Sequence, residues 1–370
     1  MEYMKLGDIV NIRTGKLNAN VADEKGSYPF FTCSKKISSI SSYSYDTEAV
    51  LVAGNGDLNV KYYKGKFDAY QRTYIITDNS SNQLYMPFLY FYMSAYVAQL
   101  RNQAIGGVIK YIKLQNLTEA EIRLPSIEQQ KEIVKFLQII QGVINDKKNE
   151  MSKLDELIKA RFVEMFGDPV LNSNNYKNNY LEQYIEFITS GSRGWSKYYK
   201  KDGKYWFITI KNVKNSHITK DNMQTITPPD NQEAKRTKVK EGDLLISITA
   251  DLGRTGVVTK DIADHGSYIN QHLTCLRLNT DRINPVYVSY FLESSAGKRQ
   301  FSVKNQNGVK AGLNFKAIKK LKILIPPLSL QNKFVNFVQQ VDKSKFENIV
   351  YLNKTLSMKI LGQLGDVFRD

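Results

Sequence analysis

The first strong pattern along the chain is a 3–4 spacing of apolar residues over two long stretches. One stretch begins near Ile133 and continues to Met165, and the other begins near Phe334 and continues to Leu364. This spacing is typical of a helix that packs through a narrow apolar seam. We predict two helices of about forty residues, each roughly 60 Å long. They are expected to pack as an antiparallel pair, and the alternative is that each lies separately on its own domain.

The segments between these stretches have the pattern of short strands. Runs of β-branched and aromatic residues bounded by Gly, Asp and Asn predict strands, and they read AVLVAGNG, RTYIIT, DLLISIT, TGVVT and HLTCLRL. Short helices are expected over Pro87–Gln99 and Pro285–Leu292. The sequence therefore predicts an α+β protein with two β-rich parts and two long helices.

The order of these parts occurs twice. When the sequence is shifted by 201 residues, Gly107 to Leu137 overlays Gly308 to Val338 without a gap, with 7 identities in 31 columns. The starts of the halves also correspond, IVNIRTGK with IEFITSGS, as do their ends, VEMFGD with GDVFRD. Two copies of a long unit indicate a duplication with pseudo-twofold symmetry, since solenoids need three or more short repeats.

Charge is distributed unevenly over the predicted parts. Residues 169–325 carry 25 Lys and Arg against 13 Asp and Glu, a net charge of +12, within a total of +16. Residues 1–125 have a net charge of +3, 126–168 of −1 and 326–370 of +2. A basic block favours a polyanionic partner, while the neutral helical block favours a structural role. The alternative is a Lys-rich surface from an AT-rich genome.

Known catalytic and targeting patterns are missing from the sequence. It contains no phosphate-binding loop, no HExxH and no GxSxG, and its three histidines have no motif partner. The two cysteines suggest neither a disulfide framework nor a metal site, and no metal ligands are predicted. Because the N-terminus is not signal-like and no run of eighteen apolar residues occurs, we expect a cytoplasmic protein. Because the catalytic motifs are missing, we also expect no catalytic residues.

The amino-acid sequence at the start of each long helix is a more specific signal than composition or charge. It reads LPSIEQQKEIV from Leu124 and IPPLSLQNKFV from Ile325, each after a Gly-Val turn and an apolar strand. With Thr14-Gly15, Ser190-Gly191 and the passage AGNGDLNVKYYKGKFDAYQRTYII, this arrangement resembles the specificity (S) subunit of type I DNA restriction–modification systems. The resemblance covers essentially all 370 residues. In the second copy Leu330 stands where the family phrase has Glu, which bears only on contacts at the helix start.

The resemblance implies a division into four parts. Residues 1–125 and 169–325 would be target-recognition domains, and residues 126–168 and 326–370 would be spacer helices. Each domain would read one half of a bipartite site on double-stranded DNA, and the helices would set the half-site spacing and dock two adenine-N6 methyltransferase (M) subunits. Motor-nuclease (R) subunits would join for restriction. S-adenosylmethionine, ATP and Mg would belong to these partner subunits and not to this chain.

Two other functions remain open at this point. A fused restriction and methylation enzyme is disfavoured by the missing motifs. A coiled-coil scaffold that binds no DNA would differ from the S subunit by showing no salt-dependent DNA retention.

Base reading needs Asn, Gln, Arg and Lys side chains on loops that are rigidly held. The DNA-binding candidates in the first block are Lys35, Lys36, Asn55, Asn59, Lys61, Tyr70, Gln71, Arg72 and Lys110. Those in the second block are Arg193, Trp195, Lys197, Lys211, Asn212, Arg254, Asn270, Gln271, His272, Lys304, Asn305 and Lys310. The expected helix-pairing and methyltransferase-docking residues are Ile133, Leu137, Ile140, Ile144, Leu154, Ile158, Phe334, Val338, Val341, Leu352 and Leu356. For each single DNA candidate, the alternative is an ordinary solvated surface residue.

Overall fold

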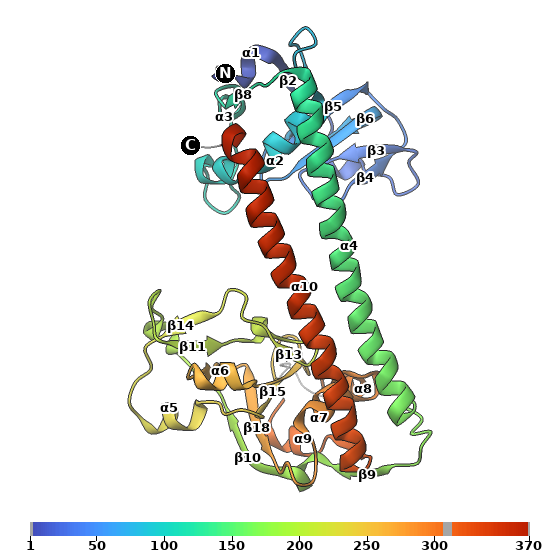
Figure 1. Ribbon diagram of the computed structural model, residues 1–370, viewed down its shortest axis with the longest axis vertical. Coiled ribbons are helices and arrows are strands. Elements are labelled where there is room, and N and C mark those ends of the chain that lie inside the picture. Colours follow the sequence, from blue (N-terminus) through green and yellow to red (C-terminus); the bar gives the residue numbers. More distant parts are fainter. Residues whose placement is uncertain (1–2, 306–312, 369–370) are drawn as a thin grey trace. The chain divides into compact units, whose positions relative to one another are not determined.

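The computed structural model describes residues 3–305 and 313–368, with side chains described except at 304–305 and 352–368 (Figure 1). The chain forms two compact units. Unit 1 comprises Met1–Asn149 and Val350–Asp370, and unit 2 comprises Glu150–Ile349. Two long helices, α4 (Ile127–Phe166) and α10 (Leu328–Phe368), contribute residues to both units. Among the described residues, no helix is long and apolar enough to cross a membrane.

Unit 1 is built around a six-stranded sheet in the order β2-β7-β5-β6-β3-β4, and β1 pairs with β8 beside it. Its strands are β1 (Tyr3–Lys5), β2 (Val10–Thr14), β3 (Tyr28–Phe31), β4 (Ser38–Ile40), β5 (Tyr45–Ala53), β6 (Val60–Ala69), β7 (Thr73–Asp78) and β8 (Glu121–Arg123). Its shorter helices are α1 (Leu6–Ile9), η1 (Ala19–Val21), α2 (Met86–Gln103) and α3 (Gln115–Thr118).

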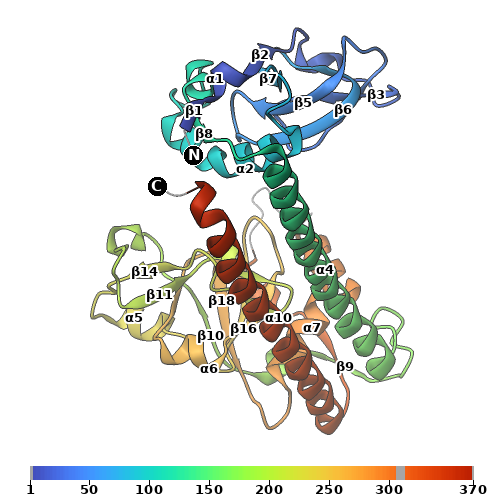
Figure 2. The ribbon, with the colours of Figure 1, turned by 45° about the horizontal axis from the view of Figure 1, so that its top comes forward.

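The central strand β5 is buried on both faces. Val50 and Val52 belong to the core under α2, whereas Ala49 and Leu51 belong to an aromatic core on the opposite face. Burial on both faces explains why this strand reads as a continuous apolar run and not as an alternation. Figure 2 shows α2 lying against this sheet.

Unit 2 divides its strands among smaller sheets, in the orders β10-β18-β15-β16, β14-β11-β17, β12-β13 and β19-β9. The strands are β9 (Lys177–Tyr180), β10 (Ile185–Ser190), β11 (Tyr205–Ile208), β12 (Val213–Lys214), β13 (His217–Ile218), β14 (Gln224–Ile226), β15 (Leu244–Ser247), β16 (Thr255–Val257), β17 (Tyr268–Ile269), β18 (Leu273–Leu278) and β19 (Lys322–Ile325). The shorter helices are η2 (Leu181–Tyr184), η3 (Trp195–Tyr198), η4 (Ile210–Asn212), α5 (Gln232–Thr237), α6 (Lys260–Asp264), α7 (Pro285–Glu293), α8 (Ser295–Asn305) and α9 (Phe315–Lys319).

The duplication is visible as equivalent backbone hydrogen bonds in the two units. Leu6 N–Ala120 O (2.8 Å) in unit 1 corresponds to Leu181 N–Leu321 O (2.8 Å) in unit 2, and Gly15 N–Thr73 O (3.0 Å) corresponds to Gly191 N–Leu273 O (3.0 Å). In the same way, Gly54 N–Arg72 O (2.8 Å) corresponds to Ile248 N–His272 O (3.0 Å), and Ile112 N–Gly54 O (2.9 Å) corresponds to Leu313 N–Ile248 O (2.9 Å). The expected α+β duplication is therefore confirmed. Each unit carries its own equivalent set of loops, and the candidate site lies on them.

The repeated T/S-G motif has a steric cause. A Cβ on Gly15 would lie 2.1 Å from the carbonyl oxygen of Ala69, and one on Gly191 would lie 2.0 Å from that of Asn270. Both distances are far below any van der Waals contact, so a glycine is required at this crossing in each copy.

The repeated helix-start phrase is explained by one buried glutamine in each copy. Gln130 is fully buried, and its amide donates to the carbonyl oxygens of Pro125 (2.8 Å) and Gln83 (2.7 Å) while accepting from the Tyr85 N–H (2.8 Å). Gln331 is equally buried, donates to Pro326 O (2.8 Å) and accepts from Asn284 N (2.9 Å). Each glutamine thereby joins the start of a long helix to the start of α2 or α7.

Each long helix begins two residues after the first proline of its phrase, at Ile127 after Pro125 and at Leu328 after Pro326. At the position of Leu330, the first copy has Gln129. Gln129 accepts from the Ser126 N–H (3.1 Å) and donates its own N–H to Ser126 Oγ (3.3 Å), which is a capping box that the second copy lacks.

The helix pair is antiparallel within unit 2, as expected. Asn348 contacts Glu150 (3.0 Å), Lys345 forms an ion pair with Asp155, and Phe334 packs on Phe162 with ring centroids 5.3 Å apart. Residue numbers therefore rise along α4 as they fall along α10. Both helix segments also pack on α7, where Tyr287 stacks on Phe162 of α4 and Tyr290 packs on Phe334 of α10 with ring centroids 5.3 Å apart.

Candidate nucleic-acid interface

In unit 1 the candidate residues lie on four loops at the end of the sheet where β5 ends and β6 and β7 begin. Three hydrogen bonds join these loops. The Gly54 N–H donates to Arg72 O (2.8 Å), the Gly56 N–H donates to Lys110 O (2.9 Å), and the Asn59 amide donates to Cys33 O (2.8 Å). Segments that are far apart in the sequence thus form one surface, which we call surface 1: residues 32–37, 54–59, 70–72 and 104–113.

The projecting members of surface 1 are cationic or amide side chains. Lys36, Arg72 and Lys110 are exposed, and in the described part of the chain they form no ion pair with a carboxylate. Lys35 is paired with Asp57 (2.7 Å). Gln71 is exposed and donates to Asn18 Oδ1 (3.1 Å). Three free cations beside a fixed amide suit contacts to phosphates and base edges.

The remaining candidates of the first block are half-buried and hold the loops. Lys61 donates to Asn59 Oδ1 and to Thr32 O (3.4 Å). Its burial lowers the pKa of the ammonium group from the ordinary value. The backbone of Asn55 forms a β-bridge with Tyr111, and that of Tyr70 forms one with Leu17. These contacts support the rigidity that base reading needs.

Unit 2 repeats this arrangement at the equivalent positions. The His272 ring contacts Thr249 Oγ1 through Nδ1 (2.6 Å) and the Gln271 amide through Nε2 (3.1 Å), and the Gln271 N–H donates to Ser192 O (3.0 Å). We call residues 190–193, 248–254 and 270–272 surface 2. Gln271 and His272 occupy the places that Gln71 and Arg72 occupy in surface 1.

The candidates of the second block divide by exposure. Arg193, Lys197 and Lys211 are exposed, and Arg254 is half-buried and forms an ion pair with Asp251. Lys304 and Asn305 lie on helical backbone whose side chains are outside the described part, and Lys310 lies outside the described residues.

Three candidates are buried and have structural roles. Trp195 is 3% exposed, stacks on Phe207 with centroids 5.9 Å apart and donates to Glu233 (3.2 Å). Asn212 is 3% exposed and caps η4, and Asn270 is 8% exposed. Their side chains cannot reach a base without leaving the core, so only their neighbours project.

Signals in the sequence could have identified further members of these surfaces. GNGDL (54–58) and ITADL (248–252) occupy equivalent turns, at a shift of 194 and not 201 residues. Gly56 and Ala250 both have a left-handed φ, of +70° and +56°. This local alignment identifies Thr249 as a surface 2 residue, whereas the gap-free overlay stops short of it.

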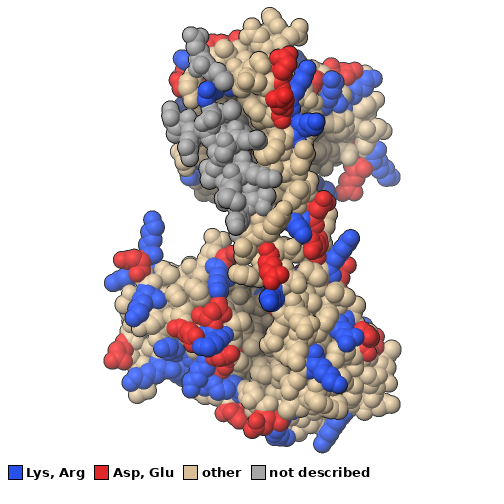
Figure 3. All heavy atoms as spheres, in the orientation of Figure 1, with Lys and Arg blue, Asp and Glu red and all other residues tan. Residues whose placement is uncertain are grey.

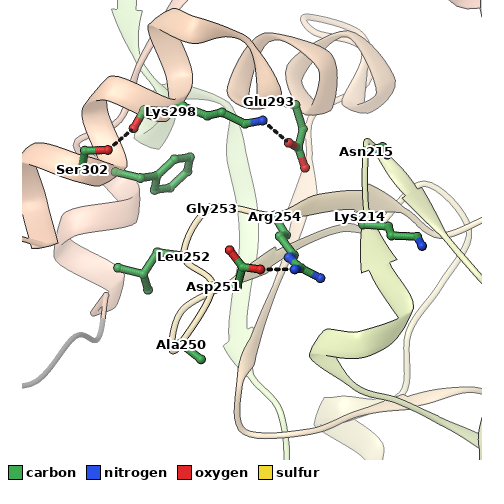
Figure 4. Close-up of a pocket in the computed structure, with 11 residues that line it drawn as sticks. Lys214, Asn215, Ala250, Asp251, Leu252, Gly253, Arg254, Glu293, Lys298 and Ser302 are labelled. Atoms are coloured by element: carbon green, nitrogen blue, oxygen red, sulfur yellow. Dashed lines mark hydrogen bonds and ion pairs between the residues drawn. The ribbon is translucent and has the colours of Figure 1, made fainter. Parts of the chain in front are cut away.

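A cavity of about 530 Å³ lies behind the turn of surface 2 (Figure 4). Its polar side chains largely pair with one another: Arg254 with Asp251, and Lys298 with Glu293 (3.4 Å). Lys214 is exposed at its edge. In the described residues, no group of three His, Cys, Asp or Glu side chains could hold a metal ion.

Positive charge is visible over unit 2. Figure 3 shows Lys and Arg side chains gathered over the part that carries β11, β14, α5 and α6, with carboxylates among them. This agrees with the excess of 25 cationic over 13 anionic residues in 169–325.

The helix residues expected to pair or dock are mostly internal. Buried members are Leu137, Ile140, Ile158, Phe334, Val338 and Val341, and partly buried members are Ile133, Ile144 and Leu154. The side chains of Leu352 and Leu356 are outside the described part. Buried residues pack within the chain, so a docked protein would instead meet exposed helix residues such as Leu157 and Val163, which are 48% and 49% exposed.

Comparison with known proteins gives consistent matches. The family model for the type I restriction modification DNA specificity domain matches residues 1–157 and 140–357. The EcoDI specificity subunit of Escherichia coli is 36% identical over 156 residues, which are 42% of this chain and 34% of that protein. The EcoBI specificity subunit of Escherichia coli is 19% identical over 321 residues, which are 80% of this chain and 66% of that protein.

A solved structure has the same fold. The type I restriction-modification S subunit from M. genitalium aligns with a TM-score of 0.55 and 15% identity, over 100% of this chain and 96% of that one. The chain spans about one third and two thirds of the length of the two curated relatives. These relatives are specificity subunits, the non-catalytic recognition components of type I restriction enzymes. The chain belongs to the type I restriction modification DNA specificity domain family, as the duplicated phrase and its strands predicted.

Proposed function

We propose that this chain is the DNA-reading subunit of a type I restriction–modification complex. Residues 1–125 and 169–325 each act as a target-recognition domain for one half of a bipartite site. Residues 126–168 and 326–370 act as spacer helices that set the distance between half-sites. The chain carries no catalysis of its own, and S-adenosylmethionine, ATP and Mg belong to its partners.

One observation carries this proposal. Surfaces 1 and 2 are built from equivalent loops, held by equivalent hydrogen bonds, yet present different side chains. Gln71 and Arg72 stand in one, Gln271 and His272 in the other. A shared frame with different reading groups is what an asymmetric two-part sequence requires. Both surfaces carry a glutamine, but the arginine of surface 1 can make a bidentate contact to guanine that the histidine of surface 2 cannot make.

The partners follow from the family. Two adenine-N6 methyltransferase subunits would dock on the helices, and motor-nuclease subunits would join for ATP-dependent cleavage. Exposed apolar helix residues such as Leu157 and Val163 support a protein contact there, because buried seam residues are unavailable to a partner.

Salt-dependent DNA retention tests the proposal. The chain, co-purified with a methyltransferase subunit encoded beside it, should retain duplex DNA, and the affinity should fall steeply with salt. The change Arg72→Ala with Lys110→Ala should weaken binding. Lys5→Ala with Lys343→Ala is the matched control, which removes two exposed cations outside both surfaces and should change retention little. A wild-type complex that retains no DNA at low salt would contradict the proposal.

A further inference from the structure

An apolar loop tip projects from surface 1. Val108 is 104% exposed and Ile109 is 63% exposed, so Val108 makes no contact with its own chain. Single exposed apolar residues are common on protein surfaces. Two adjacent β-branched residues at the tip of a held loop are unusual, because water contact makes both unfavourable in the free protein.

The tip is held by a rigid base. Ile105 and Tyr111 exchange two backbone hydrogen bonds, N–H to O at 3.0 and 2.9 Å, and this isolated β-bridge closes the loop of residues 106–110. Gly106 has φ +115°, and a Cβ there would lie 2.7 Å from Ile109 O. The loop therefore needs glycine to form this turn, and its tip geometry is fixed rather than collapsed onto the sheet.

The base of this loop is hydrogen-bonded to the candidate reading loops. The Gly56 N–H donates to Lys110 O, and the Ile112 N–H donates to Gly54 O, both at 2.9 Å. Lys110 is exposed next to the tip, and Lys36 and Arg72 lie on the connected loops. Exposed cations thus lie on the same joined loops as two side chains that cannot bind phosphate.

We propose that Val108 and Ile109 enter the DNA groove and contact thymine 5-methyl groups in the half-site read by unit 1. This inference rests on the proposed function and names specificity-determining residues within it. The major groove is wide enough for an α-helix or a two-stranded ribbon and therefore has room for this loop tip, and the thymine methyl is the one apolar group that a base presents there. The exposed cations on the joined loops favour DNA over a protein surface as the occupant, since they can contact phosphates beside the groove.

The test uses a double variant that carries both Val108→Ser and Ile109→Ser. Its control is the single variant Leu171→Ser. Leu171 is 76% exposed and belongs to unit 2, so its change removes an exposed apolar side chain elsewhere. Each protein is measured in complex with its methyltransferase partner by fluorescence anisotropy. Three duplexes are used. The first carries the sequence motif that the complex methylates, the second carries this motif with the unit 1 half-site scrambled, and the third carries it with uracil in place of thymine in that half-site. A half-site that contains a target adenine also contains thymine on the opposite strand.

Wild type and Leu171→Ser should lose about fourfold in affinity for each methyl contact when uracil replaces thymine. The double variant should lose a similar factor on the thymine duplex and then be insensitive to uracil, with an unchanged salt slope. The inference is overturned if the double variant keeps the wild-type thymine preference, if it weakens cognate and scrambled duplexes equally, or if it loses only methyltransferase assembly. A wild-type complex that binds no duplex would instead overturn the proposed function, and this inference with it.

Discussion

At the scale of single residues, the two buried glutamines are the clearest case of one side chain serving several backbone groups. Gln331 satisfies the carbonyl of Pro326 and the amide of Asn284, and it is fully buried. Without its amide, both backbone groups stay in the core without a partner. An unsatisfied buried polar group costs about 1–3 kcal/mol, so this position should tolerate little change.

We therefore expect Gln331→Ala to lower the free energy of unfolding of unit 2 by about 2–4 kcal/mol, because two backbone partners are lost. Chemical denaturation followed by circular dichroism measures the change. Gln339→Ala is the control on the same helix, where the side chain is exposed, and it should stay within about 0.5 kcal/mol of wild type. Equal stability of the two variants would show that the buried hydrogen bonds of Gln331 do not contribute to the free energy of unfolding.

A second residue-scale prediction concerns pH. Burial alone would lower the pKa of His217, but the hydrogen bond and charge of Asp342 outweigh burial, so the pKa rises above its ordinary value of 6.5. His217 Nε2 lies 2.8 Å from Asp342 Oδ2, and Nδ1 lies 2.7 Å from Asn215 O. Because the folded state holds the proton more tightly, the stabilisation is complete below the unfolded pKa and is lost as pH rises through the folded one.

Stability of unit 2 should accordingly decrease between about pH 6 and about pH 8, in excess of any decrease in His217→Gln. Urea midpoints at the two pH values provide the comparison. Asp342→Asn should flatten the same dependence, since it removes the carboxylate that raises the pKa. A wild-type pH profile that matches that of His217→Gln would show that this ion pair does not contribute to the pH dependence of stability.

At the scale of elements, the helix pair of unit 2 is stabilised by an aromatic cluster at one end. Phe162 and Phe166 of α4 pack on Phe334 of α10 and on Tyr287 of α7. All four rings are buried. The α4 segment of unit 2 is thus part of the same core as the strands, and not a helix lying on their surface.

Phe162→Ala should cost about 3–5 kcal/mol, since it opens a cavity in this cluster. Leu157→Ala lies on the same helix but at an exposed position, and its cost should be below about 1 kcal/mol. Thermal unfolding of both variants gives the comparison. Similar melting temperatures for the two would mean that α4 does not belong to the core of unit 2.

The helices and the main strands could be predicted from the sequence because their signals are local. The apolar spacing gives α4 and α10, and β-branched runs give β5, β7, β15 and β18. The burial of Trp195 and Asn212 could not be predicted, because nothing in the local sequence tells whether a loop residue packs inward. The equivalence of Arg72 and His272 also needed the structure, since insertions between the copies change the shift from 201 to 200 residues.

At the scale of the whole molecule, the proposed function assigns reading to the two units and spacing to the long helices. The two units use one framework of hydrogen bonds, whereas their projecting side chains and their charge differ, +3 over 1–125 against +12 over 169–325. Phosphate contacts supply affinity and base contacts supply specificity. Unit 2 is therefore suited to carry more of the non-specific binding energy, while each unit would determine the bases of its own half-site.

The central claim is that each unit reads its own half of one DNA site. Single-molecule methylome sequencing of cells that express this chain with its methyltransferase partner tests it most directly. Three chains are compared: wild type, a Gln71→Ala/Arg72→Ala variant and a Gln271→Ala/His272→Ala variant. Wild type should give one adenine-methylation motif with two specific parts separated by a fixed gap. The first variant should relax only one part, and the second variant only the other. A single contiguous motif, or two variants that relax the same part, would contradict the account.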